Sequence, residues 1–186
     1  MYLILDAGSQ KTPQIAEMLT SLGCMNRTIP LMNVQDKDFE KVSAVIISGS
    51  PILLTKEPHA PFLERIKYLK SGKIPTLGIC FGHQLLGLLF GAQIFKGGEV
   101  RTSITIQIID NNAALFKGFE KEEIFSEDHT EGISLPRDFE LLASSMLYKV
   151  EAMKHPSLPI YGVQFHPETS GDNGKKLFSN FLRIVK

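Results

Sequence analysis

The chain has 186 residues, of which 20 are basic and 20 acidic, so its formal net charge at pH 7 is zero. Without a basic field, neither nucleic acid nor an anionic membrane surface is an expected partner. No apolar run approaches the roughly 20 residues that span a bilayer, and the N-terminus has no basic leader or small-residue cleavage site, which favours a cytoplasmic protein.

The first half of the chain alternates strand-like and helix-like segments. Short apolar runs at residues 2–5, 44–47 and 76–79 predict buried parallel strands. Between them, apolar residues recur at helical spacing over 13–22 and 61–69, each with a proline near its start. This alternating order predicts an α/β fold.

A further helix is predicted over 82–90, apolar nearly all round, as expected for a helix buried beside a sheet. The pattern then changes to strands, predicted at 103–110, 141–144, 150–154 and 160–165, before a final amphipathic helix at 175–185. The predicted architecture is a mostly parallel sheet flanked by helices, with ligands bound at the carboxyl ends of its strands.

Neither an internal repeat nor a low-complexity linker interrupts the chain, so residues 1–186 are expected to form one domain. The two cysteines, Cys24 and Cys80, lie far apart and in no metal-type spacing, which argues against a disulfide framework or a zinc site. We expect Cys24 to be buried at the entry to a strand, and we expect no metal and no cofactor.

Cys80 lies in the segment Leu77–Leu86, LGICFGHQLL, between two glycines where a strand is predicted to turn into a helix. Free cysteine is commonly a small buried hydrophobe, and flanking glycines can mark an ordinary tight turn. However, Gly-x-nucleophile-x-Gly is also the sequence form of a nucleophile elbow, a strained turn that lifts a reactive side chain above the sheet edge. The second interpretation requires a base elsewhere in the chain.

A base and an orienting carboxylate follow a predicted strand in YGVQFHPE, at His166 and Glu168. In extended backbone, residues i and i+2 share a face, and proline favours extended geometry in the residue before it, so the carboxylate can accept from one imidazole nitrogen. These residues predict a triad in which Cys80 attacks a carbonyl carbon, His166 moves its proton, and Glu168 fixes the tautomer.

An oxyanion hole is also required, because a tetrahedral intermediate places negative charge on oxygen. The backbone amide of Phe81, next after the nucleophile, is the expected first donor. Gly49 is the expected second donor, in the loop SGSPILLTKEP at Ser48–Pro58; the alternative is an ordinary strand-to-loop turn. Few features of this sequence would lock the loop's amides in one orientation. We therefore expect that a peptide flip turns an N–H away from the oxyanion, and that the chain without a partner catalyses its reaction slowly.

The segments GICFGHQL, SGSP and FHPE resemble the motifs of class I glutamine amidotransferases, in order and spacing, across nearly the whole chain. That resemblance implies glutamine hydrolysis through a cysteine thioester, on a flavodoxin-like three-layer α/β fold with extra strands in the C-terminal half. It assigns the catalytic roles to Cys80, His166 and Glu168, and it implies that Gln84 helps to hold glutamine.

A narrower similarity links the chain to the glutaminase of GMP synthase. The opening LILDAGSQKTPQIA is similar to that family's Asp-x-Gly-Ser-Gln-x-Thr segment, and VEAMKHPSLPIYGVQFHPE to its approach to the catalytic histidine. EDHTEG, with His129 and Glu131, occupies the region of a Ser-His-x-Asp segment near the substrate, and Asp128 and Glu131 depart from that segment. This makes His129 a candidate substrate-binding residue; an exposed loop residue is the alternative.

Two further positions depart from the family pattern. Ser50 replaces the second glycine of the usual Ser-Gly-Gly-Pro loop; it joins the candidate substrate-binding residues, and it would be strained if φ there were positive. The segment after FHPE, TSGDNG, lacks a histidine that is common there in GMP synthases.

No phosphate-binding loop of the Walker type occurs in the chain, so it cannot adenylylate a nucleotide by itself. The resemblance implies that ammonia passes to a separate ATP-pyrophosphatase synthase subunit, which makes GMP from XMP. The alternatives are the glutaminase of anthranilate or aminodeoxychorismate synthase, a catalytically silent glutamine-binding protein of the same fold, and a Cys-His peptidase.

Overall fold

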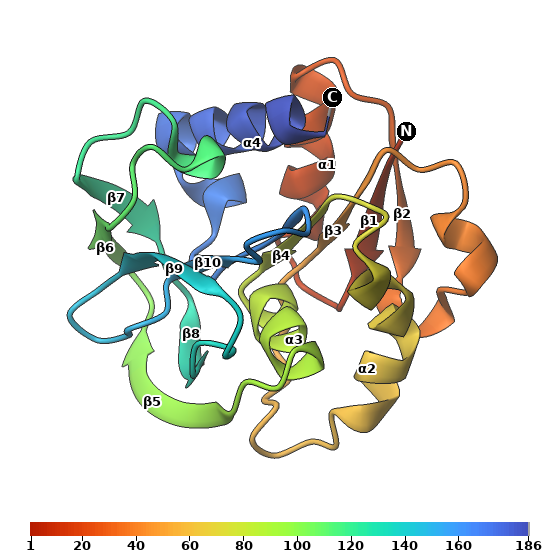
Figure 1. The fold of residues 1–186 in the computed structure, drawn as a ribbon, viewed down its shortest axis with the longest axis horizontal. Helices are drawn as coiled ribbons and strands as arrows, with labels where there is room; N and C mark the ends of the chain where they lie inside the picture. The colour runs from red at the N-terminus through yellow and green to blue at the C-terminus, as the bar shows by residue number, and fades with distance from the viewer. Residues whose placement is uncertain (186) are drawn as a thin grey trace.

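The computed structural model describes residues 1–185, which form a central sheet with helices on both faces (Figure 1). The sheet has nine strands in the order β2-β1-β3-β4-β11-β10-β9-β6-β7, and β5 pairs with β8 in a separate two-stranded sheet. The strands are β1 (Tyr2–Asp6), β2 (Asn26–Pro30), β3 (Ala44–Ile47), β4 (Thr76–Ile79), β5 (Ile94–Val100), β6 (Ser103–Ile108), β7 (Glu122–Ser126), β8 (His129–Ile133), β9 (Glu140–Ser144), β10 (Ala152–Lys154) and β11 (Ile160–Val163). The α-helices are α1 (Thr12–Ser21), α2 (Ala60–Ile66), α3 (Phe81–Leu89) and α4 (Gly171–Ile184).

The large sheet has a parallel half and an antiparallel half. Strands β2, β1, β3, β4 and β11 pair in parallel, whereas β10, β9, β6 and β7 extend the sheet through antiparallel pairs. Parallel neighbours need crossover connections, which α1 supplies between β1 and β2 and α2 between β3 and β4. The predicted α/β class is confirmed, and the extra C-terminal strands form the antiparallel half.

Alternating side chains of β1 contribute to two hydrophobic cores, one on each face of the sheet. Ile4 packs in a core that includes Leu19 of α1 and Phe181 of α4. Leu3 and Leu5 pack in the other core, which includes side chains of α2 and α3. Because successive strand side chains point to opposite faces, one apolar strand joins both helix layers. Figure 1 shows this arrangement, with α1 beside α4 and α2 beside α3.

Most predicted elements agree with the structure, and the strands at 44–47 and 76–79 have the predicted bounds. The final helix begins at Gly171 rather than 175, and the helix predicted over 61–69 becomes a 3-10 helix at Lys67–Ser71. Strands β2, β5, β7 and β8 were given no range in the prediction. Cys24 precedes β2 but is only half-buried, so its predicted burial is wrong. No helix within residues 1–185 combines the length and apolar character needed to cross a membrane.

The carboxyl ends of β3, β4 and β11 meet at one edge of the sheet. In the strand register, Ile47 is opposite Gly78, and Ile79 is opposite Val163. Because the three strands are parallel neighbours, the loops that follow them start side by side. This edge therefore gathers segments that are far apart in the sequence.

At this edge, α3 packs so closely on the sheet that Gly82 has no room for a side chain. A Cβ on Gly82 would lie 2.4 Å from the carbonyl oxygen of Ile47, a backbone atom that cannot rotate away. The Gly82 N–H donates to the Ser48 carbonyl at 3.2 Å, which holds the start of α3 against the loop after β3. Packing therefore requires the second glycine of the Gly-x-Cys-x-Gly segment.

We predict that Gly82→Ala lowers the free energy of unfolding by about 1–3 kcal/mol, because the added methyl group forces α3 away from β3. Urea denaturation followed by circular dichroism measures the change. Gly98→Ala is the matched control, since a Cβ at Gly98 has no atom within 4 Å, and its effect should stay within about 0.5 kcal/mol. Equal effects of the two substitutions would contradict this explanation.

Candidate active site

Cys80 occupies a strained turn between β4 and α3. Its backbone has φ 51° and ψ −106°, and within residues 1–185 only Lys41 shares a positive φ among the non-glycine residues. Such conformations cost of order 1–3 kcal/mol and persist where the surrounding structure fixes them. Here the Cys80 N–H donates to the Val163 carbonyl at 2.9 Å, and the Cys80 carbonyl accepts from the Gln84 N–H at 3.0 Å. The turn has the geometry expected of a nucleophile elbow.

His166 and Glu168 are in direct contact, with Nδ1 of the imidazole 2.7 Å from Oε1 of the carboxylate and both side chains buried. The sequence predicted this contact through extended backbone, which is wrong, because Pro167–Thr169 forms a 3-10 turn. The turn folds Glu168 back onto the ring. Since Nδ1 is engaged by the carboxylate, Nε2 is the nitrogen available for proton transfer.

Ser170 fixes the backbone of His166, a role that the sequence did not reveal. The Ser170 hydroxyl donates to the His166 carbonyl at 2.7 Å and accepts from the Ser126 N–H at 2.9 Å. The His166 N–H donates to the Ser126 carbonyl at 2.8 Å. The end of β7 is thus tied to the histidine turn, and the only sequence signal was the position of Ser170 two residues after Glu168.

Cys80 and His166 lie side by side against Gly49. A Cβ on Gly49 would lie 3.0 Å from Cε1 of His166 and 3.7 Å from Cβ of Cys80. Burial alone would lower the pKa of His166, but the adjacent Cys80 and Glu168 raise it to about 10. Within residues 1–185, Nε2 of His166 has no hydrogen-bond partner, and the thiol donates instead to the Asp128 carbonyl at 4.0 Å. Catalytic contacts of this kind commonly tighten when substrate binds.

Three backbone N–H groups near the nucleophile, those of Gly49, Ser50 and Phe81, have no acceptor within the described chain. The C=O and N–H of one peptide unit point in opposite directions. The Ser48 carbonyl accepts from Gly82, which fixes the Gly49 N–H, and the Gly49 carbonyl accepts from the Ser48 hydroxyl at 2.9 Å, which fixes the Ser50 N–H. The expectation that few features lock these amides is therefore wrong, and the peptide flip loses its basis.

Ser50 occupies its position without the strain considered from sequence. Its φ is not positive, and its hydroxyl accepts from the Ile52 N–H at 3.2 Å, which closes a turn in the loop. Serine is therefore compatible with the backbone at this point, in place of the family's second glycine.

A cavity of about 370 Å³ opens beside Cys80, a volume suited to one small ligand. Its walls come from the loops after β1 and β3, the start of α3, the segments around β8 and the histidine turn; they comprise Gly8, Ser9, Gln10, Lys11, Ser50, Pro51, Ile52, Leu53, Cys80, Phe81, Gln84, Arg101, Asp128, His129, Thr130, Glu131 and His166. The cavity thus brings together Cys80, His166 and all three candidate substrate-binding residues. Glu168 lies behind His166 and does not line it.

Gln84 and His129 are buried at the cavity wall, and both donate to the backbone carbonyl of Glu131. The Gln84 amide reaches this carbonyl at 3.0 Å and Oε1 of Gln164 at 3.1 Å, while Nδ1 of His129 reaches it at 2.9 Å. His129 belongs to β8 and is 6% exposed, so the alternative of an exposed loop residue is wrong. Their engaged donors make both residues part of a fixed wall.

A buried cluster of Glu127, His129 and Glu151, which the sequence did not indicate, lies behind this wall. Oε2 of Glu127 lies 2.9 Å from Nε2 of His129. Burial raises the pKa of Glu127 to about 7 and that of Glu151 to about 8. The carboxyl groups therefore retain protons near neutral pH, which supplies donors among groups that are otherwise acceptors.

This cluster is also the one group of metal-ligating side chains within residues 1–185, with three ligand atoms within 4.8 Å of one another. Two carboxylates and an imidazole are suitable ligands for a divalent cation. The contact between Glu127 and His129 shows that two of these groups also pair with each other directly. The absence of a metal remains a prediction.

Lys11 and Arg101 both form ion pairs with Asp128 at the mouth of the cavity. Burial alone would raise the pKa of Asp128, but the two cations hold it below its usual value. The three residues come from the loop after β1, the β5–β6 turn and the β7–β8 turn. The sequence marked Asp128 only as a departure from the family pattern and did not indicate Lys11 or Arg101 as its partners, because only the fold brings these segments together.

Comparison with known proteins shows that residues 3–185 match the family model of Glutamine amidotransferase class-I. One of the subunits of glutamine-hydrolysing GMP synthase from Pyrococcus furiosus is 38% identical over 188 residues, which cover 99% of this chain and 98% of that protein. The corresponding protein from Methanocaldococcus jannaschii is 33% identical, with 99% of this chain and 97% of that protein covered.

Solved structures show the same fold. A Thermoplasma acidophilum protein described as a GMP synthase subunit superposes with a TM-score of 0.90 at 29% identity, covering 99% of this chain and 92% of that one. A glutamine amidotransferase of Thermotoga maritima superposes with a TM-score of 0.85 at 18% identity, covering 100% and 98%, and supports the fold alone.

Folding of the chain is linked to protonation of Glu127 and Glu151. Because their folded pKa values lie above the ordinary value of 4.5, the folded chain binds more protons than the unfolded chain between about pH 4.5 and 8. The contribution of these two groups to the free energy of unfolding therefore falls as pH rises through this window.

We predict that Glu127→Gln, which stays neutral, matches the parent chain in stability at pH 5 and exceeds it by of order 1 kcal/mol at pH 8. Thermal melts of both chains at both pH values give the comparison, in which groups common to the two chains cancel. Glu17→Gln, at an exposed position of α1, is the control and should show no such pH-dependent difference. A constant difference between Glu127→Gln and the parent would argue against the retained proton.

Proposed function

For this chain, which belongs to the class I glutamine amidotransferase family, we propose hydrolysis of glutamine to glutamate and ammonia that supplies a separate GMP synthase subunit. The observation that carries the proposal is the position of Cys80 on its elbow, beside His166 and Glu168 at the wall of a small cavity. The family match supports the reaction, and the names of the relatives support the use of its ammonia.

In the first half of the proposed reaction, the Cys80 thiolate forms a bond to the side-chain amide carbon of glutamine. The carbonyl oxygen becomes an oxyanion, to which the N–H groups of Gly49 and Phe81 are the proposed donors. His166 gives the proton on Nε2 to the amide nitrogen. The C–N bond then breaks, which releases ammonia and leaves a thioester on Cys80.

In the second half, water attacks the thioester carbon while Nε2 of His166 takes a proton from it. The C–S bond breaks, glutamate leaves, and the thiolate of Cys80 is restored beside the imidazolium. One glutamine and one water thus give one glutamate and one ammonia. Glu168 keeps the proton on Nδ1 and stabilises the positive charge of the ring, for which its 2.7 Å contact is suited.

The remaining cavity residues are proposed to hold the substrate. Ser50, Gln84 and His129 contribute to its walls, and the engaged donors of Gln84 and His129 give them fixed positions. We propose that residues 1–186 act as one amidotransferase domain without a metal or cofactor.

An ATP-pyrophosphatase subunit that makes GMP from XMP is the proposed partner. The proposal gives no role to nucleic acid or to a membrane surface, and the cytoplasm is the expected setting. A glutaminase of anthranilate or aminodeoxychorismate synthase would use the same triad, so only the partner distinguishes these functions. The catalytically silent alternative is weakened, because Ser50 is unstrained and the N–H of Gly49, a proposed oxyanion donor, is already held in one orientation.

We predict that the chain releases glutamate and ammonia from glutamine when its synthase subunit is present, and that Cys80→Ala lowers this activity at least about 10⁴-fold. The thiol is the atom that forms the thioester, whereas its loss leaves only a small space in the fold. Glutamate and ammonia are measured with and without candidate synthase subunits, and circular dichroism checks the fold. Undiminished activity in Cys80→Ala would remove this residue from the mechanism.

The two partners of the imidazole contact should differ in importance. We predict that Glu168→Gln loses at least about tenfold less activity than His166→Ala, because an amide still orients the ring whereas alanine removes the proton carrier. Steady-state kcat/KM for glutamine measures both. Equal and complete losses, accompanied by a lower melting temperature of Glu168→Gln, would show that Glu168 mainly supports folding.

A further inference from the structure

We infer that Glu131 is a positioning residue for the glutamine pocket, since its buried carboxylate holds the pocket-lining loop after β3 in place. The inference rests on the proposed glutaminase function. It concerns a residue that touches neither Cys80 nor His166 and that the sequence marked only as a departure from the family pattern.

Three hydrogen bonds connect the Glu131 carboxylate to the loop. Oε2 accepts from the Leu54 N–H at 2.8 Å, and Oε1 accepts from the Thr55 N–H at 2.9 Å and from the Thr55 hydroxyl. Glu131 is 2% exposed and lies 77 residues after Leu54 in the chain. Hydrogen bonds to a buried carboxylate are roughly twice as strong as neutral ones, so this is a firm tertiary contact.

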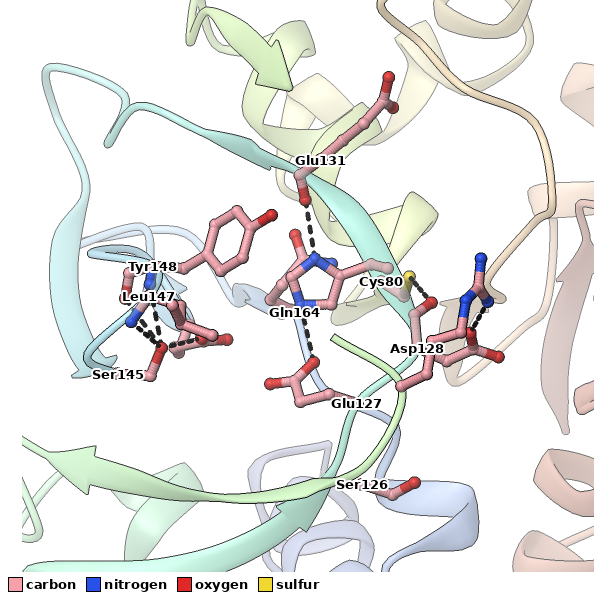
Figure 2. A network of polar contacts seen from close by, with 12 residues as sticks. Cys80, Ser126, Glu127, Asp128, Glu131, Ser145, Leu147, Tyr148 and Gln164 are labelled. Carbon is pink, nitrogen blue, oxygen red and sulfur yellow. Dashed lines mark hydrogen bonds and ion pairs between the residues drawn. The ribbon is translucent and has the colours of Figure 1, made fainter. Parts of the chain in front are cut away.

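The backbone of Glu131 is fixed independently of this contact. Its carbonyl accepts from the side chains of Gln84 and His129, and β8 pairs with β5 through Lys96 opposite Glu131. Figure 2 shows the side chain of Glu131 pointing away from Gln164 and Glu127. The carboxylate therefore projects from a rigid strand toward the loop.

The loop is anchored at two points, and the segment between them lines the cavity. Its first residues are held by the Gly82 N–H and by the Ser48 hydroxyl, and Leu54 and Thr55 farther along the loop are held by Glu131. The residues between the anchors, 50–53, all face the cavity. Loss of the second anchor would free this wall but leave the Gly49 N–H fixed by the first anchor.

This separation of anchors predicts which kinetic constant changes. A wall that contacts the unreacting part of the substrate contributes equally to ground state and transition state, so its loss raises KM. An oxyanion donor acts chiefly in the transition state, so its loss lowers kcat. Because the Gly49 donor is held separately, removal of the Glu131 anchor should act mainly on KM.

The length of the Glu131 side chain is also matched to this contact. Aspartate at this position would be shorter by one C–C bond of about 1.5 Å. From the same strand it would not reach both N–H groups at hydrogen-bond distance without a shift of the loop. Glutamate at this position is thus matched to the loop of this chain.

The test uses Glu131→Gln in the full chain, assayed with a saturating concentration of its synthase subunit. The amide can accept at one oxygen only, and its NH₂ faces a backbone N–H, so at least one anchor bond is lost. We expect KM for glutamine to rise about tenfold or more while kcat stays within about threefold. Hydrogen exchange of the peptide that contains Leu54 and Thr55 should become faster.

Glu57→Gln is the matched control. It makes the same charge change at an exposed position of the loop that Glu131 holds, so KM and kcat should both stay unchanged. The alkylation rate of Cys80 by iodoacetamide should be equal in parent and variant, which separates positioning from loss of fold. Should Glu131→Gln fail to fold, Thr55→Val removes only the hydroxyl donor, and a smaller rise in KM is expected.

An unchanged KM, or a fall in kcat at constant KM, would overturn the inference. Unchanged exchange at Leu54 and Thr55 would also overturn it. If the parent chain shows no glutaminase activity with any synthase subunit but the variant still exchanges faster, the proposed function fails while the anchoring role stands.

Discussion

The hydrogen bond from the Gly82 N–H to the Ser48 carbonyl is the contact on which the site depends. It forms because Gly82 has no side chain, which lets the start of α3 approach β3 closely. On the helix side, this contact holds the start of α3 beside the loop, while the Cys80 carbonyl, which accepts from the Gln84 N–H, fixes the adjacent N–H of Phe81. On the loop side, the planarity of the Ser48–Gly49 peptide fixes the Gly49 N–H. The close approach of the two backbones therefore places the turn that carries Cys80 next to the proposed oxyanion donor at Gly49.

Four buried glutamates lie in or behind the cavity wall, and the cost of their burial is offset in three different ways. An unpaired buried carboxylate would cost several kcal/mol. Glu168 contacts His166, and Glu131 accepts from the backbone and hydroxyl of the loop. Glu127 and Glu151 instead retain protons, because burial raises their pKa values. Keeping that pair neutral limits the negative charge behind the cavity, which favours chemistry that passes through a thiolate and an oxyanion.

The sequence indicated the parts of the site whose signals are local. The elbow around Cys80 and the histidine–glutamate pair follow short apolar strands, and such strands are visible as runs of a few residues. Strand β8 was missed because its residues are mostly polar, and they are buried through contacts with distant partners rather than through an apolar face. For the same reason Glu131 was seen only as a departure from a pattern, since its role depends on a loop 77 residues earlier. Long-range polar contacts leave no periodic signal in one sequence.

The cavity accounts for glutamine but not for the compound that receives ammonia. The wall that the loop after β3 contributes is held by internal contacts, among them the anchors at Ser48 and Glu131. Ammonia is small and uncharged, so the glutaminase need not contact the acceptor in order to serve it. Differences between synthases that share this chemistry should therefore lie on the partner and on the surface that meets it. This is why the triad alone supports the reaction, whereas the assignment to GMP synthesis depends on similarity over the whole chain.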